Sequence, residues 1–326
     1  MEKQAGTAPD YLEDKHLSVG IKKYLKVLNA GGAVETLSKE DARDVLITVQ
    51  AGVKVDLSGI EESEKIITDK DYPVKLTIVR PIGIIEKLPA FIFIHGGGWI
   101  LGDYITHKRM VRDLVVESGY AAVFVNYSPS PEAKYPQAIN EVYAATKWIA
   151  KHGDEINIDG KRLALVGNSA GGNMAIATSL LAKKNNESLI KVQILLWPVT
   201  DTYFDTDSYK MYAEQRFLTT SMMQWMFDQY ANDPKQRKEI YFSPLLASID
   251  ELKGLPPTII LVAENDILRD EGEELGRKLD EAEVDVTTIR YNGVIHDFGL
   301  LNGLAALPQT RSMFIYSAGA LKYYLK

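Results

Sequence analysis

Residues 163–172 decide the fold, and they read Leu163-Ala164-Leu165-Val166-Gly167-Asn168-Ser169-Ala170-Gly171-Gly172. An apolar run typical of a buried strand leads directly into a Gly-x-Ser-x-Gly pattern, and a helical pattern follows. A serine on a tight strand-to-helix turn has strained backbone geometry, and the chain crowds itself two residues before and after it. Gly167 and Gly171 supply positions without a Cβ there. We therefore expect Ser169 to lie above the carboxyl end of a strand, where open α/β sheets bind ligands.

Strands and helices alternate around this stretch after about residue 70. Apolar, β-branched or aromatic runs predict strands at Val74–Val79, Ala90–Ile94, Ala121–Val125, Leu163–Val166, Val192–Leu196, Thr258–Val262 and Val286–Arg290. Helical spacing of apolar residues predicts helices over Ala138–His152, Ala170–Lys183 and Glu271–Ala282. Several strands are apolar at consecutive positions, which is typical of strands that helices cover on both faces. The sequence therefore predicts an α/β fold with a mostly parallel, doubly wound sheet.

Two segments interrupt this alternation. The first segment, residues 1–70, has a helical pattern over Val19–Leu28 and a second one after the capping-box sequence at Ser38–Asp41. The second segment, around 201–235, is rich in Tyr, Met and Trp. We expect an N-terminal helical cap segment (1–70) and a catalytic domain (71–326) with a cap insertion around 201–235. The alternative is that both segments are ordinary peripheral helices.

Composition excludes several classes of protein. Apolar residues make up 46% of the 326 residues and charged residues 25%, which is typical of a globular protein. The formal net charge is −7 without a basic block, which argues against nucleic acid or an anionic membrane as the main partner. The absence of cysteine excludes disulfides and thiolate chemistry. The longest uncharged stretch, Leu88–Gly102, is too short for a membrane span, and the polar, acidic N-terminus lacks the pattern of a secretory signal. We therefore expect a soluble, cytoplasmic protein.

A second glycine-rich stretch reads His95-Gly96-Gly97-Gly98-Trp99 and follows a buried apolar run. Acyl transfer creates negative charge on the former carbonyl oxygen, and preorganised N–H donors stabilise it. Glycines let backbone N–H groups approach a substrate without obstruction by side chains. We predict that Gly97, Gly98 and Ala170 supply an oxyanion hole, with Ala170 at the start of a helix. The alternative to an oxyanion hole is that this stretch is a flexible loop without a catalytic role.

A serine nucleophile needs a base and a carboxylate that orients it. Of the five histidines, His296 lies in a loop after the last predicted strand, a suitable position for a general base. Asp266 follows the strand Thr258–Val262, and the chain order is then Ser, Asp, His. Glu264 and Asp270 remain alternatives to Asp266. Asp297 adjoins His296 and is badly placed to hold the same ring.

These motifs together resemble the hormone-sensitive-lipase-like family of α/β-hydrolase esterases. The matching stretches are 95–99, 167–172, 266–272 and 296–298, with weaker echoes elsewhere after residue 70. The resemblance implies an α/β-hydrolase fold with a helical cap. It implies Ser169 as nucleophile, His296 as base, Asp266 as its partner and Gly97, Gly98 and Ala170 as oxyanion donors. The chain departs from the family's usual pattern at Asn168, where Asp is common, and at Ile267, where Pro is common.

The resemblance implies a serine carboxylesterase that hydrolyses short-chain esters through an acyl-enzyme, without a cofactor. The histidines show no metal-ligand spacing, so no metal is expected. The same triad could instead cleave an amide, a peptide or an acetylated sugar, and a non-catalytic ligand-binding homologue is a further alternative. The expected partner is a small-molecule ester. The sequence leaves the oligomeric state open, a homo-oligomer included.

Overall fold

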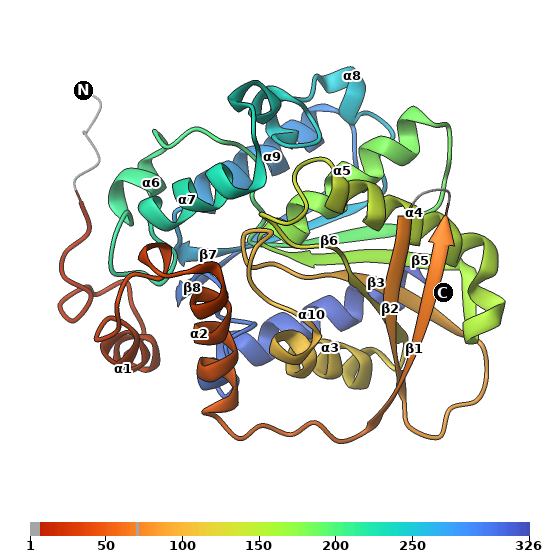
Figure 1. The fold of residues 1–326 in the computed structure, drawn as a ribbon, viewed down its shortest axis with the longest axis horizontal. Coiled ribbons are helices and arrows are strands. Elements are labelled where there is room, and N and C mark those ends of the chain that lie inside the picture. The colour runs from red at the N-terminus through yellow and green to blue at the C-terminus, as the bar shows by residue number, and fades with distance from the viewer. Residues whose placement is uncertain (1–6, 70–71) are drawn as a thin grey trace.

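The computed structural model describes residues 7–69 and 72–326, so residues 1–6 and 70 of the predicted N-terminal segment lie outside the described residues, as does residue 71 (Figure 1). The described residues form an eight-stranded sheet with the order β1-β2-β4-β3-β5-β6-β7-β8. The β1–β2 and β2–β4 pairs are antiparallel, and the other neighbours run parallel. The predicted α/β class is confirmed. The strands are β1 (Ile60–Asp69), β2 (Tyr72–Pro81), β3 (Leu88–Ile94), β4 (Ala121–Asn126), β5 (Ile158–Asn168), β6 (Val192–Leu196), β7 (Thr258–Asn265) and β8 (Val286–Ile295).

Helices cover both faces of this sheet, and Figure 1 shows α3 and α10 on one face and α4, α5 and α9 on the other. Two clusters of buried apolar side chains lie on the two faces, because strand residues point alternately to opposite sides. The α-helices are α1 (Val19–Leu28), α2 (Lys39–Ala51), α3 (Tyr104–Ser118), α4 (Gln137–His152), α5 (Ala170–Lys184), α6 (Asp207–Met211), α7 (Thr220–Tyr230), α8 (Ile249–Leu252), α9 (Arg269–Glu281) and α10 (Pro308–Tyr324). Among the described residues, no helix is long and apolar enough to cross a membrane.

The edge strand β1 is absent from the strands that the sequence predicts. It carries Glu61, Glu62, Glu64 and Lys65, and most of its described side chains are exposed, so it lacks the apolar runs of the central strands. Charged side chains are common on edge strands because they discourage pairing with another chain. The sheet therefore begins at Ile60 and extends into the segment 1–70 that was expected to be helical. The sheet therefore starts earlier in the chain than predicted. The division into a cap segment and a catalytic domain remains a prediction.

The two segments that interrupt the alternation lie together. Figure 1 shows α1, α2, α6 and α7 near the end of the sheet at which β7 and β8 terminate. The side chain of Ser221, in α7, donates a hydrogen bond to Glu35, and the backbone N–H of Ala8 donates to the carbonyl of Met211. These contacts join residues 7–51 to residues 201–235. The assignment of the two segments to one cap remains a prediction.

Candidate active site

Ser169 occupies the turn between β5 and α5 with φ 54° and ψ −121°, a conformation in the left-handed half of backbone space. Its N–H donates to the carbonyl of Leu196, in the neighbouring strand β6. The turn is so tight that a Cβ on Gly171 would overlap the carbonyl of Ile94, at the end of β3. The predicted strand-turn-helix geometry is therefore present, and it fixes the position of the serine hydroxyl.

The structure brings the three predicted triad side chains together. His296 Nε2 lies 3.0 Å from Ser169 Oγ, and His296 Nδ1 lies 2.7 Å from Asp266 Oδ2. The other carboxylate oxygen, Asp266 Oδ1, accepts a hydrogen bond from the N–H of Leu268 at 3.0 Å. All three side chains are buried, with exposed fractions of 4% for Ser169, 2% for His296 and 1% for Asp266. This chain of hydrogen bonds can move a proton from the hydroxyl to the imidazole.

The predicted oxyanion loop follows β3 and lies against the serine turn. Gly97 and Gly98 have φ of 95° and 61°, which glycine adopts without strain. Within residues 7–69 and 72–326, their N–H groups donate to no other protein atom, so they remain available to an external acceptor. Met226, in α7, packs directly on Gly98, and a Cβ at position 98 would overlap its sulfur atom. Ala170 is the first residue of α5, where backbone N–H groups have no acceptor within the helix.

Two side chains support this loop from behind. His95 Nδ1 lies 2.8 Å from the carbonyl of Gly96, and the His95 ring stacks on Tyr127 with ring centroids 4.1 Å apart. Burial lowers the pKa of His95 to about 4, which keeps this imidazole neutral. Asn168 Oδ1 accepts a hydrogen bond from the N–H of Gly96 at 2.9 Å. In the sequence Asn168 stands out only as a departure from the usual pattern, and its role in supporting the loop was missed.

The other acidic residues near the triad have different partners. Glu264 accepts from the N–H of Gly293 at 2.7 Å, and Asp270 accepts from the N–H of Ser208 at 2.7 Å. Asp297 Oδ1 accepts hydrogen bonds from Trp197 Nε1 at 2.7 Å and from Asn168 Nδ2 at 3.1 Å. Its other oxygen lies 3.9 Å from His296 Nε2, beyond hydrogen-bond distance. Of the three candidate acids, only Asp266 orients the imidazole in this structure.

Opposing effects act on the pKa of His296. Burial lowers it, but the nearby carboxylates of Asp266 and Asp297 raise it, and the net pKa lies above the ordinary imidazole value.

A second buried carboxyl, Glu271 in α9, accepts from the N–H of Thr200 at 2.6 Å. Burial raises its pKa well above the ordinary value. No pattern in the sequence indicates that Glu271 joins α9 to the loop after β6.

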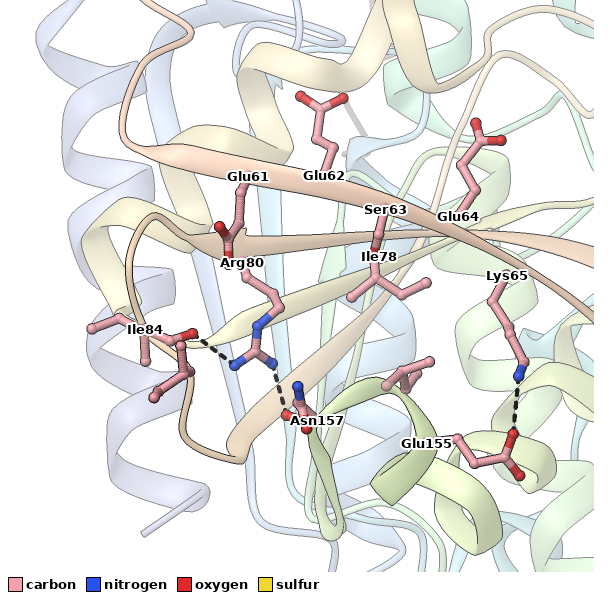
Figure 2. A pocket seen from close by; sticks show the side chains of 12 residues that line it. Glu61, Glu62, Ser63, Glu64, Lys65, Ile78, Arg80, Ile84, Glu155 and Asn157 are labelled. Carbon is pink, nitrogen blue, oxygen red and sulfur yellow. Dashed lines mark hydrogen bonds and ion pairs between the residues drawn. The ribbon is translucent and has the colours of Figure 1, made fainter.

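A pocket of about 490 Å³ lies elsewhere, at the β1–β2 edge of the sheet, and Figure 2 shows its side chains. It contains none of the predicted site residues. Lys65 pairs with Glu155, and Arg80 donates to backbone carbonyls of Asn157 and Ile84. Among the described residues, no group of three or more His, Asp or Glu side chains has a geometry suited to a metal ion.

Comparison with known proteins identifies the family to which this chain belongs. The family model described as "alpha/beta hydrolase fold" matches residues 91–300, which include every predicted site residue. The chain belongs to the α/β hydrolase fold family. A thermostable esterase from Pseudomonas putida has a solved structure that is 51% identical, with a TM-score of 0.95, and the match covers 96% of this chain and 99% of that one.

Relatives in this α/β hydrolase family carry the names of enzymes that act on esters. An arylesterase of Saccharolobus solfataricus is 34% identical over 253 residues, 77% of this chain and 79% of that protein. An ethyl acetate hydrolase of Pseudomonas putida is 32% identical over 210 residues, 64% of this chain and 65% of that protein. These matches confirm the predicted membership among hormone-sensitive-lipase-like esterases and the predicted enzyme class, a carboxylic ester hydrolase.

Proposed function

We propose that this α/β hydrolase is a serine carboxylesterase for short-chain esters, in which Ser169, His296 and Asp266 form the triad. The observation that carries the proposal is the unbroken chain of hydrogen bonds from Ser169 Oγ through the imidazole to Asp266. In the first step Ser169 Oγ attacks the ester carbonyl carbon while His296 Nε2 takes its proton. The N–H groups of Gly97, Gly98 and Ala170 stabilise the oxyanion.

The tetrahedral intermediate then loses the alcohol. The imidazolium donates its proton to the departing alkoxide, and the acyl group remains on Ser169. A water molecule repeats the attack with His296 as base, which releases the carboxylic acid and restores the hydroxyl. Asp266 keeps the proton of the neutral imidazole on Nδ1 and stabilises the imidazolium. No step in this sequence uses a cofactor.

The test of this function is a series of ethyl esters, followed by pH-stat, that runs from acetyl to long acyl chains. We expect the highest kcat/KM for acetyl to butyryl esters. This expectation rests on the resemblance and on the relative named for ethyl acetate. The same series measured with the Ser169→Ala variant gives the blank. Activity confined to long acyl chains would contradict the short-chain proposal. If the enzyme hydrolysed the matching acyl anilides but none of the esters, the amidase alternative would be favoured.

The pH dependence of this reaction follows from His296. Only the neutral imidazole accepts the serine proton, so kcat/KM should rise as pH increases through the pKa of His296. Because the two carboxylates outweigh burial, the inflection should lie above the ordinary imidazole pKa of about 6.5. The measurement is kcat/KM for one acetate ester, followed by pH-stat across the range in which imidazole titrates.

The Asp297→Asn variant provides the comparison for this profile. It removes one of the charges that raise the pKa of His296, so the inflection should move to lower pH. An inflection that stays fixed in this variant would show that Asp297 does not act electrostatically on the imidazole.

A further inference from the structure

The loop between α6 and α7, residues 212–219, carries an aromatic side chain to the triad. The ring centroid of Phe217 lies 6.5 Å from that of His296, and the two ring planes differ by 22°. Phe217 is half-buried and packs against the apolar clusters of both sheet faces. Its ring therefore lies next to the imidazole of the triad.

The backbone of this loop is strained. Gln215 and Phe217 have φ of 63° and 74°, values in the left-handed region that non-glycine residues rarely adopt. Strain of this kind persists only where surrounding contacts determine the conformation. Contacts with neighbouring segments are therefore expected to help hold this loop and Phe217 in place.

Arg216, between the two strained residues, supplies the main contact. Its Nη2 donates to Asp14 Oδ2 at 2.8 Å and to the carbonyl of Pro9 at 2.8 Å. Both partners of the ion pair are buried, with side-chain exposed fractions of 2% each. A buried ion pair requires precise geometry, and removal of one partner leaves the other as an uncompensated buried charge. The N-terminal segment, residues 7–17, thus fixes the backbone on which Phe217 is carried.

The same N-terminal segment is also attached to the loops of the triad. The carbonyl of His16 accepts from Asn265 Nδ2 at 3.0 Å, and His16 Nδ1 lies 3.0 Å from Glu264 Oε1. Just beyond the segment, the N–H of Ser18 donates to the carbonyl of Gly293 at 3.0 Å. Asn265 precedes Asp266, and Gly293 lies at the end of β8 before His296. One segment therefore positions Phe217 relative to the imidazole.

The chemistry of ester cleavage indicates which part of a substrate would lie next to Phe217. His296 Nε2 must protonate the departing alkoxide, so the alcohol oxygen lies within hydrogen-bond reach of the imidazole. The alcohol part of the ester therefore extends past the histidine side of the site. The acyl part remains bonded to Ser169 and its oxygen points to the oxyanion donors.

From this arrangement we propose that Phe217 limits the size of the alcohol part of the ester, and that the Asp14–Arg216 pair is the positioning contact that holds it there. This inference rests on the proposed esterase function. A bulky alcohol would have to displace the Phe217 ring, whose strained backbone is held in place by the Asp14–Arg216 pair. A small alcohol would fit beside the imidazole without moving it.

The test uses two series of esters, followed by pH-stat with the full chain. One series keeps the acetyl group and varies the alcohol from ethyl to benzyl and cyclohexyl, and the other keeps ethanol and varies the acyl chain. In the Phe217→Ala variant we expect the benzyl-to-ethyl ratio of kcat/KM to rise about tenfold or more. The acyl selectivity should stay within about twofold. Phe204→Ala is the matched control, because Phe204 is a half-buried cap phenylalanine that packs on Tyr209 and Phe227 instead.

The positioning contact is tested separately with Asp14→Asn. This variant should raise the same ratio in the same direction, whereas Asp10→Asn, an exposed change in the same segment, should not. An unchanged alcohol ratio in Phe217→Ala, or a shift in acyl selectivity instead, would overturn the assignment of Phe217. Equal ratios in Asp14→Asn and Asp10→Asn would overturn the role of the ion pair. If the unmodified chain hydrolyses no ester in either series, the proposed function itself fails.

Discussion

The Ser169→Ala variant should lose about 10⁶-fold in kcat for acetate esters, the largest effect expected of any single substitution in the site. The variant lacks the oxygen that forms the acyl-enzyme, and the imidazole then has no bound proton donor. The remaining rate should come from the oxyanion donors and from substrate binding, and KM should change little. The measurement is the initial rate of the variant at high enzyme concentration. In the unmodified chain, burst-phase release of p-nitrophenol from p-nitrophenyl acetate is the direct sign of an acyl-enzyme.

Folding should not complicate this result. The Ser169 side chain makes no capping hydrogen bond to α5, so its replacement removes no contact that supports the helix. Ser179→Ala is a matched control, because Ser179 is also buried in α5 but donates to Gln193 at 2.8 Å. This control should keep its activity. A Ser169→Ala variant that still hydrolyses esters would rule out Ser169 as the nucleophile.

Much of the fold could be predicted from the sequence because its signals are local. The central strands are covered on both faces and therefore consist of continuous apolar runs, and α1 begins after Ser18, whose side chain accepts the N–H of Ile21. The edge strand β1 could not be found in this way. Its exposed charged residues carry no apolar pattern, and only pairing with β2 makes it a strand.

The candidate site divides in the same way. Ser169 and the glycines were predictable because tight turns exclude side chains, a constraint that is visible within a few residues. Asp266 was predicted from its position in the loop after a strand and from the resemblance. Chain order does not separate it from Glu264 and Asp270, and only the structure shows the partners of each carboxyl. The contact between Asp14 and Arg216 joins residues 202 positions apart, and no local pattern indicates such a pair.

Asp266→Asn is expected to have the second-largest effect, about a 10⁴-fold loss of kcat. The reason lies in the N–H of Leu268, which donates to Asp266 Oδ1. An asparagine at this position would use its oxygen to accept that N–H, and its amide nitrogen would then face His296 Nδ1. A donor opposite Nδ1 forces the imidazole proton onto Nε2, so the ring can no longer take the proton of Ser169. The side chains would keep their positions while the proton occupies the wrong nitrogen.

Asp297→Asn is the control that separates this effect from a general loss of negative charge. Asp297 also raises the pKa of His296, but its oxygen lies 3.9 Å from Nε2 and it makes no bond to Nδ1. Its replacement should shift the pH profile and reduce kcat far less than Asp266→Asn does. Comparison of kcat for the two variants above the inflection removes the pKa effect and leaves the effect of the tautomer. Equal losses in the two variants would mean that the negative charge, rather than the hydrogen bond to Nδ1, is what the base requires.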